Sequence, residues 1–296
     1  YTKGAGISIV GTYHNSGGPD YPTFDNIIVS NNFATGNIYS SGGGIYTNYN
    51  IFPIISNSVI ENNYAQHEGG GIYVAGDHSV TYNNCIIRNN EAELAGGIYA
   101  GGLHTVTFSM NDCEIIDNIS TSTADNNSGV VIGNIFHLKN VLIAGNDRRI
   151  YLSPYAPSTL ENVTITNNGD GVYVGDGMDP NYNPGININN TIIAHNGPNP
   201  FEPNSQLISD PQNENDVDIF VENSLINGLF WIADSPGSEN LLFSFGSYQA
   251  EPLTHFEDPL FTDPEAGDYT LAWGSPCINT GDIDLDGDTE SCITDS

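Results

Sequence analysis

Positive charge is scarce in this sequence. Lys and Arg together number 5 in 296 residues, against 36 Asp and Glu, and the formal net charge is -31. A nucleic-acid-binding protein needs a basic surface that neutralises phosphates, so this class is excluded. Direct attraction to an anionic glycan or an anionic lipid surface is equally unfavourable, unless a divalent cation bridges the two.

Long hydrophobic runs and cysteines are also scarce. No stretch approaches about 18 uninterrupted apolar residues, so the sequence predicts no transmembrane segment. The 4 Cys residues are too few for a disulfide scaffold. The chain begins at Tyr1 without Met or a signal peptide, and we interpret it as a processed or excised piece of a longer precursor.

Residues that favour helices are few, whereas residues that favour strands and turns are many. The chain has 2 Met and 5 Lys and Arg, but 33 Gly and abundant Asn, Thr, Ile and Val. Asn and Gly favour turns, and β-branched residues favour strands. Aromatic residues make up 10% of the chain and are spread along it, which a disordered acidic tail would not show. The composition therefore predicts a folded all-β protein.

A repeat with the pattern Asn-x-x-[Ile/Val]-x-x-Asn recurs about every 28 residues. The Ile or Val of each copy is expected to face the core, whereas Asn at equivalent positions can form a ladder in which each amide donates to one coil and accepts from another. The first Asn column is Asn26, Asn57, Asn84, Asn140, Asn162, Asn190 and Asn223, with Asp112 substituting in the fourth copy. The second column is Asn32, Asn63, Asn90, Asn118, Asn146, Asn168 and Asn196. The apolar column is Val29, Ile60, Ile87, Ile115, Ile143, Ile165, Ile193 and Ile226.

A second motif, such as GGGIYT (42–47) or GGGIYV (69–74), follows each copy of the first. Alternation along it places Ile on one side of a short strand and Tyr on the other. The period is too short for a propeller blade, and the strands are too β-branched for a helical solenoid. A parallel β-helix fits, because each repeat then forms one coil and the coils stack at about 4.8 Å.

The segment LENVTITNNGDGVYV (160–174) is close to the repeat of the right-handed parallel β-helix family, which the chain resembles over roughly residues 1–230. The resemblance implies an all-β, right-handed solenoid of about eight to ten coils. Residues 255–282 resemble a segment that closes many secreted bacterial β-helix proteins. We therefore expect a parallel β-helix over residues 1–253 and a C-terminal closing segment over residues 254–296.

An acidic run near the end of the chain is the sharpest candidate metal site. Alternating carboxylates around a Gly that permits a tight loop supply the hard oxygen ligands that Ca²⁺ prefers. The alternative is a solvated acidic tail. The candidate calcium ligands are Asp282, Asp284, Asp286, Asp288 and Glu290.

The second motif also predicts an outward column of tyrosines, and two interpretations of it stay open. Flat aromatic rings can bind sugars, or they can stack on one another and stabilise the sheet. A gap in the fourth coil, assigned to Gly133, favours stacking. The column is Tyr46, Tyr73, Tyr99, Tyr151 and Tyr173.

The cysteines form two candidate pairs. Cys85 and Cys113 occupy equivalent positions in adjacent repeats, either as a disulfide or as buried free thiols. Cys277 and Cys292 could close a loop around the acidic run if the protein is exported.

Catalytic residues are not assigned. The resemblance admits a polysaccharide lyase, but the only basic cluster is Lys139, Arg148 and Arg149, which also fits a solvated turn. A glycoside hydrolase needs two carboxylates at a defined separation, and Asp147 and Asp170 have nearly equivalent offsets in successive coils.

The sequence favours a secreted or cell-surface bacterial β-helix with a structural, adhesive or glycan-binding role, stabilised by calcium. Its expected partners are a polysaccharide or surface glycan, and a neighbouring domain or subunit at the open N-terminal coil. A carbohydrate-active enzyme and a subunit of a larger extracellular assembly remain the alternatives.

Overall fold

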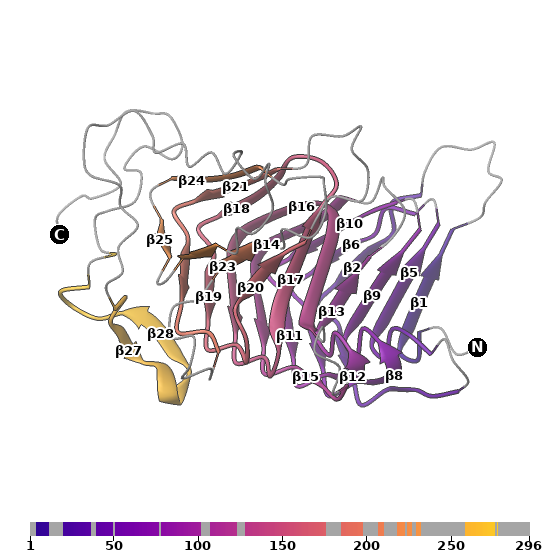
Figure 1. The fold of residues 1–296 in the computed structure, drawn as a ribbon. Coiled ribbons are helices and arrows are strands. Elements are labelled where there is room, and N and C mark those ends of the chain that lie inside the picture. The colour runs from indigo at the N-terminus through magenta and orange to yellow at the C-terminus, as the bar shows by residue number, and fades with distance from the viewer. Residues whose placement is uncertain are drawn as a thin grey trace.

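The protein is a parallel β-solenoid in a computed structural model, and its strands stack side by side along one axis (Figure 1). The structure describes residues 4–11, 20–36, 40–49, 51–76, 78–101, 107–122, 128–175, 185–197, 207–209, 218–222, 224–226, 229–231, 258–275 and 277. Among these residues the only helical segment is a 3-10 turn at Pro264–Ala266. No helix in this part of the chain is long and apolar enough to cross a membrane.

Each coil contributes strands to up to three faces of the solenoid. The first face is formed by β1 (Ile7–Val10), β5 (Ile45–Asn48), β9 (Ile72–Ala75), β13 (Ile98–Ala100), the start of β16 (Ser128–Ala144), β17 (Arg149–Pro154), β20 (Val172–Val174), β23 (Leu207–Ser209) and β26 (Leu229–Trp231). Every pairing on this face is parallel and joins neighbouring coils.

The second face consists of two runs of strands that meet at a bend. The first run is β2 (Thr23–Asp25), β6 (Ile54–Ser56), β10 (Ser79–Asn83), β14 (Thr107–Ile116), β16, β18 (Ser158–Glu161), β21 (Gly185–Asn189) and β24 (Asp218–Glu222). The second run is β3 (Ile28–Ser30), β7 (Val59–Glu61), β11 (Ile86–Arg88), the ends of β14 and β16, β19 (Thr164–Thr166), β22 (Ile192–Ala194) and β25 (Leu225–Ile226). The third face is shorter and comprises β4 (Phe33–Ala34), β8 (Tyr64–Glu68), β12 (Glu91–Leu94) and β15 (Ile119–Ser120).

The fold class expected from the sequence is confirmed, whereas the expected number of coils was somewhat too high. The structure supports about five turns of the solenoid. Parallel pairing extends past these turns as short strands, from β1 at one end to β26 at the other. Several segments that connect one strand to the next in sequence, such as residues 102–106 and 210–217, lie outside the described residues.

The Asn-rich motifs place Asn at two backbone bends in each coil. Asn57 and Asn84, in the first Asn column, have φ of 50°, and Asn62, which precedes Asn63 of the second column, has φ of 54°. Positive φ is costly for most L-residues but is tolerated by Asn, Asp and Gly. These bends turn the chain from one run of strands to the next, which explains why Asn recurs in the sequence.

The core is one continuous column of aliphatic side chains inside the solenoid. The predicted apolar column from Val29 to Ile226 is buried throughout, with exposed fractions from 0% to 4%. Burial of each such side chain contributes about 1.5–3 kcal/mol, so the column is a principal source of stability.

The glycines of the second motif are required by close packing between coils. A Cβ atom at Gly71 would lie 2.7 Å from the carbonyl oxygen of Gly97 and 2.8 Å from Nδ2 of Asn90. Only Gly leaves room for the adjacent backbone and for the Asn side chain beneath it. The two sequence motifs are therefore physically coupled.

The closing segment forms a small antiparallel hairpin of β27 (Phe261–Asp263) and β28 (Asp268–Leu271), beside the C-terminal coils (Figure 1). Its contacts reach two bends of the solenoid. The hydroxyl of Tyr269 accepts a hydrogen bond of 3.3 Å from Nδ2 of Asn167, and Nε2 of His195 lies 3.4 Å from Oδ1 of Asp258. His195 also packs edge-on against Phe261, with ring centroids 5.9 Å apart.

Candidate functional site

The outward tyrosines of the first face lie in one register. Tyr46 pairs with Tyr73, Tyr73 with Tyr99, and Tyr151 with Tyr173. The position between Tyr99 and Tyr151 is occupied by Val131, not by Gly133, which pairs with Ser153. The sequence alignment misplaced this gap by two residues, because that coil carries Gly-Val-Val in place of Gly-Ile-Tyr. We call Tyr46, Tyr73, Tyr99, Val131, Tyr151 and Tyr173 the tyrosine row.

The first three rings of the tyrosine row stack face to face. The ring centroids of Tyr46 and Tyr73 are 5.4 Å apart with 3° between the planes, and those of Tyr73 and Tyr99 are 5.2 Å apart with 6°. Because each ring covers the face of the next, the faces are turned along the solenoid axis. Only ring edges and hydroxyls are directed outward, and Tyr46 is itself 2% exposed.

The tyrosine row has an acidic border that the sequence analysis did not identify. Oε2 of Glu68 accepts a 3.4 Å hydrogen bond from Oγ of Ser41, and the Glu68 carboxylate also bonds to the hydroxyl of Tyr73. Burial raises the pKa of Glu68 above its ordinary value, and these two hydrogen bonds oppose that shift. Burial, followed by the nearby Glu68 charge, raises the pKa of Tyr73 well above its ordinary range.

A second carboxylate lies on the adjacent coil at the same corner. Oε2 of Glu93 is 2.9 Å from Nδ1 of His67, the residue before Glu68. The pairing of β12 with β8 shifts register between Ala92 and Leu94, at the position of Glu93. A bulge of this kind redirects a side chain, and such irregularities are common beside functional sites. The one sequence feature that pointed to this acidic border is the adjacent pair His67 and Glu68.

The two Asn columns differ in environment. In the first column Nδ2 of Asn84 donates to Oδ1 of Asn57 at 2.8 Å, and Nδ2 of Asn162 donates to Oδ1 of Asn140 at 3.1 Å, at exposed positions. Asn57 in turn donates to Asp25 at 2.7 Å. Asn26 lies at the same bend, with φ of 54°, and Asn190 has φ of 49°, whereas Asn223 lies outside the described residues.

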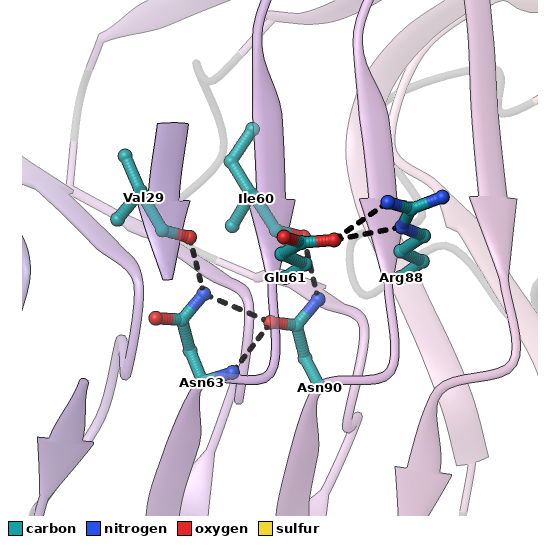
Figure 2. A network of polar contacts seen from close by, with 6 residues as sticks. All are labelled: Val29, Ile60, Glu61, Asn63, Arg88 and Asn90. Atoms are coloured by element: carbon teal, nitrogen blue, oxygen red, sulfur yellow. Dashed lines mark hydrogen bonds and ion pairs between the residues drawn. The ribbon is translucent and has the colours of Figure 1, made fainter. Parts of the chain in front are cut away.

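The second Asn column is buried and more extensively bonded. Figure 2 shows Nδ2 of Asn63 donating to the carbonyl of Val29 at 2.9 Å and to Oδ1 of Asn90 at 3.0 Å. Asn90 repeats this pattern one coil later, with Nδ2 donating to the carbonyl of Ile60 at 3.0 Å. The same pattern continues through Asn118, Asn146 and Asn168. Each amide therefore connects its own coil to the coil before it and the coil after it.

Cys85 and Cys113 belong to a third polar column that includes hydroxyls. Both are free thiols. The backbone N–H of Cys85 donates to Sγ of Cys113 at 3.4 Å, and Cys113 donates back to the carbonyl of Asn111 at 3.1 Å. Thr191 takes the same two roles, accepting from the N–H of Val163 at 3.3 Å and donating to the carbonyl of Asn189 at 3.0 Å. The thiols therefore act here as hydroxyl equivalents.

The basic side chains that the structure describes are all engaged with an acid or an aromatic ring. The contacts are Arg88 with Glu61 at 2.7 Å (Figure 2), Lys139 with Glu161 at 2.6 Å, Arg148 with Asp147 at 3.9 Å, and Arg149 with the ring of Tyr173 at 4.0 Å. Lys3 lies outside the described residues.

The sequence suggested Asp147 and Asp170 as a candidate carboxylate pair, and the pKa of Asp147 is shifted in the structure. Burial raises the pKa of Asp147, and the charge of Asp170 adds to this shift. Opposing it, Oδ1 of Asp147 accepts a 2.8 Å hydrogen bond from the N–H of Ser120. The charge of Asp170 therefore acts on Asp147, as the smallest of the contributions to its pKa.

The candidate calcium ligands from Asp282 to Glu290 lie outside the described residues, as does Cys292. Within the described ranges, no group of three or more His, Cys, Asp or Glu is arranged to hold a metal ion. Cys277 is a free thiol in the structure.

A family model described as a right-handed β-helix region matches residues 70–228, which is more than half of the chain. The chain belongs to the right-handed β-helix family. No curated protein and no solved structure matches it. The matched residues of this β-helix include most of the tyrosine row and most of both Asn columns, whereas Glu68 lies just before them.

Proposed function

We propose that this β-helix is an extracellular or cell-surface protein that acts as a structural and adhesive scaffold and binds a glycan along its first face. The observation that carries the proposal is the tyrosine row with its bordering Glu68, held in register by the buried Asn column. Tyrosine hydroxyls and ring edges, together with a carboxylate, offer the mixed polar and apolar contacts that sugars need.

The charge distribution favours a neutral glycan over an anionic one. The described basic side chains already contact acids or a tyrosine ring. An anionic polymer would therefore meet a net charge of -31 with little to offset it. The same distribution weakens a lyase mechanism, since a lyase commonly uses a Lys or Arg to neutralise a uronate or remove its proton.

Calcium is part of the proposal through the acidic run from Asp282 to Glu290. Alternating carboxylates of this density match the ligand preference of Ca²⁺, and its binding would reduce a large negative charge at the end of the chain. Calcium would then stabilise the closing segment rather than take part in chemistry.

A glycan array probed with the protein tests the proposal directly. We expect binding to neutral glycans, loss of that binding in Tyr99→Leu, and full retention in Thr159→Ala, a matched outward substitution on the second face. Equal binding by the two variants would show that the tyrosine row is not the site. Absence of binding to any glycan would leave the structural role and remove the glycan-binding one.

A glycoside hydrolase is the second candidate, and the raised pKa of Asp147, with Asp170 at a nearly equivalent offset in the next coil, favours it. Hydrolases of this type use one carboxyl group with a raised pKa as the acid and a second carboxylate as base or nucleophile. Release of reducing sugar that is abolished by Asp147→Asn and by Asp170→Asn, without an unsaturated product, would establish it. Turnover that survives both substitutions would exclude this pair.

A further inference from the structure

Two Asn-Gly pairs stand at neighbouring bends of the solenoid. Asn168-Gly169 and Asn196-Gly197 both place their Asn in the buried second column, and a third pair, Asn227-Gly228, lies outside the described residues. Asn-Gly is the dipeptide most prone to cyclise, because Gly does not shield its backbone nitrogen and adopts the backbone conformations that the reaction needs. Every other Asn of this column is followed by a residue with a side chain.

The cyclisation leads to deamidation, which consumes water and releases ammonia without oxidation or reduction. The backbone nitrogen of Gly forms a bond to the side-chain carbonyl carbon of Asn. Its proton passes to the side-chain nitrogen, which departs as ammonia. Water then opens the cyclic imide at either of its carbonyl carbons. The products are Asp and isoaspartate, in which the main chain runs through the former side chain.

The folded solenoid opposes this reaction at both bends. Asn168 and Asn196 are 2% and 5% exposed. The N–H of Gly169, the attacking group at the first bend, donates to the carbonyl of Asn146 at 2.7 Å. In the next coil the N–H of Gly197 donates to the carbonyl of Asn168, also at 2.7 Å. Cyclisation therefore requires that the bend first opens, and its rate follows the fraction of open molecules.

Deamidation would prevent an opened bend from closing again. Nδ2 of Asn168 donates to the carbonyl of Ile143 at 3.0 Å, to the carbonyl of Thr166 at 3.1 Å and to Oδ1 of Asn196 at 2.9 Å. A carboxylate at residue 168 has no proton to donate and would face these buried acceptors without a hydrogen bond. Isoaspartate would in addition lengthen the main chain at the bend.

The closing hairpin contacts the residue that precedes each Asn-Gly pair. The hydroxyl of Tyr269 accepts a 3.3 Å hydrogen bond from Nδ2 of Asn167. Nε2 of His195 lies 3.4 Å from Oδ1 of Asp258, and the His195 ring packs edge-on against Phe261. Phe261 also packs edge-on against Tyr269, with ring centroids 5.7 Å apart, so one aromatic pair connects both contacts. The hairpin therefore spans the two bends that carry the Asn-Gly pairs.

We propose that Asn168 and Asn196 are sites of spontaneous deamidation, with water as the co-reactant, and that the closing hairpin keeps them unmodified. Undocking of the hairpin opens the bends, the two Asn side chains cyclise, and the resulting carboxylates keep the column from re-forming. The modification thus converts a reversible opening of the C-terminal coils into a permanent one. Glycan binding plays no part in this chemistry.

Phe261 and Trp273 offer a matched pair of variants in the closing segment. Phe261→Ala removes the ring on which the two contacts meet. Trp273→Ala removes an aromatic side chain that is 99% exposed. Asn118 is the internal control, because it lies in the same buried column but is followed by the β-branched Ile119.

Peptide mass spectrometry after incubation in mildly alkaline buffer decides the proposal. In urea-unfolded protein we expect rapid deamidation at Asn168 and Asn196 and little at Asn118. Both sites should stay unmodified in folded wild type and in Trp273→Ala, whereas Phe261→Ala should modify them about tenfold faster, because two edge-to-face contacts are lost. Equal rates in Phe261→Ala and wild type, or a folded wild type that is modified as fast as the unfolded chain, would overturn the proposal.

Tyr269→Phe guards against a Phe261→Ala protein that fails to fold, which far-UV circular dichroism would reveal. It keeps the ring and removes only the hydrogen bond to Asn167, so it should raise the rate at Asn168 more than at Asn196. An unchanged rate at Asn168 in this variant would also count against the proposal.

Asn168→Asp reproduces one product of the reaction directly. Hydrogen exchange should show that its strands β19 and β22 lose protection. Asn167→Asp is the matched control and should retain protection, since Asp117 occupies the equivalent bend position with a φ of 55°. Full protection in Asn168→Asp would show that the column re-forms around a carboxylate and would overturn the permanent step.

Discussion

Asn63 donates two hydrogen bonds to Oδ1 of Asn90, one from its backbone N–H and one from Nδ2, each at 3.0 Å. Asn90 is 0% exposed and donates onward to Asn118 at 3.0 Å. One buried amide therefore satisfies polar groups on the coils before and after it. This relationship is the repeating unit that holds the coils in register.

Asn90→Ala should destabilise the protein by about 3 kcal/mol, because it removes the acceptor for the buried backbone N–H of Asn63 and the side-chain donor to the carbonyl of Ile60. Asn84→Gly is the matched control, since Asn84 is exposed and Gly retains its φ of 50°. The control should change stability by less than about 1 kcal/mol. Urea denaturation measures both, and similar losses in the two variants would contradict the distinction between the columns.

Tyr82→Phe should stabilise the protein. The side chain of Tyr82 is 0% exposed, and its hydroxyl has no hydrogen-bond partner among the described residues. Removing an unsatisfied buried hydroxyl recovers a penalty of about 1–3 kcal/mol. Tyr73→Phe makes the same chemical change where the hydroxyl bonds to Glu68, and it should not stabilise. A thermal unfolding series in which both variants melt at or below wild type would exclude an unsatisfied hydroxyl at Tyr82.

Glu68 should make stability depend on pH in a defined direction. Burial raises its pKa in the folded state, so the protonated form is favoured by folding. Its stabilising contribution is present below the unfolded-state pKa and is lost as pH rises through the folded-state pKa. The free energy of unfolding of wild type relative to Glu68→Gln should therefore fall over that interval.

Tyr73→Phe sharpens the pH experiment. The Tyr73 hydroxyl opposes the upward shift in the pKa of Glu68, so its removal should move the loss of stability to higher pH. A difference between wild type and Glu68→Gln that stays constant with pH would show that Glu68 titrates alike in the folded and unfolded states.

Cys113→Ser should lower the free energy of unfolding by less than about 1 kcal/mol. The reason is that the hydroxyl of Thr191 makes the equivalent two hydrogen bonds in its own coil. Cys113→Ala removes the acceptor for the N–H of Cys85 and should cost about 1–3 kcal/mol. Chemical denaturation under reducing conditions measures both. A larger cost for Ser than for Ala would mean that apolar packing, rather than hydrogen bonding, selects sulfur here.

Calcium binding should depend on the acidic run. We expect calorimetric titration to show Ca²⁺ binding to the chain and its loss in the Asp284→Ala/Asp286→Ala double variant. Asp263→Ala/Asp268→Ala removes two carboxylates from the hairpin and should retain binding. Unchanged binding in the first double variant would remove the calcium assignment from these residues.

Sequence reasoning predicted the fold well because its basis was periodic. The spacing of Asn, Ile and Tyr repeats from coil to coil, and a parallel stack places equal positions in contact. It misplaced the gap in the tyrosine row at Gly133, because that coil lost the Gly-Ile-Tyr pattern that defined the alignment. It also overestimated the number of coils, since a motif can recur where complete turns do not.

The sequence by itself determined the solenoid, the inward column from Val29 to Ile226 and the recurrence of Asn, because each depends on local backbone preference and a regular period. Only the tertiary structure decided which Asn column is buried and that Glu68 meets Tyr73 and Ser41. These features depend on distances between side chains of separate coils. A repeat pattern gives both Asn columns the same spacing, so it cannot distinguish the buried column from the exposed one.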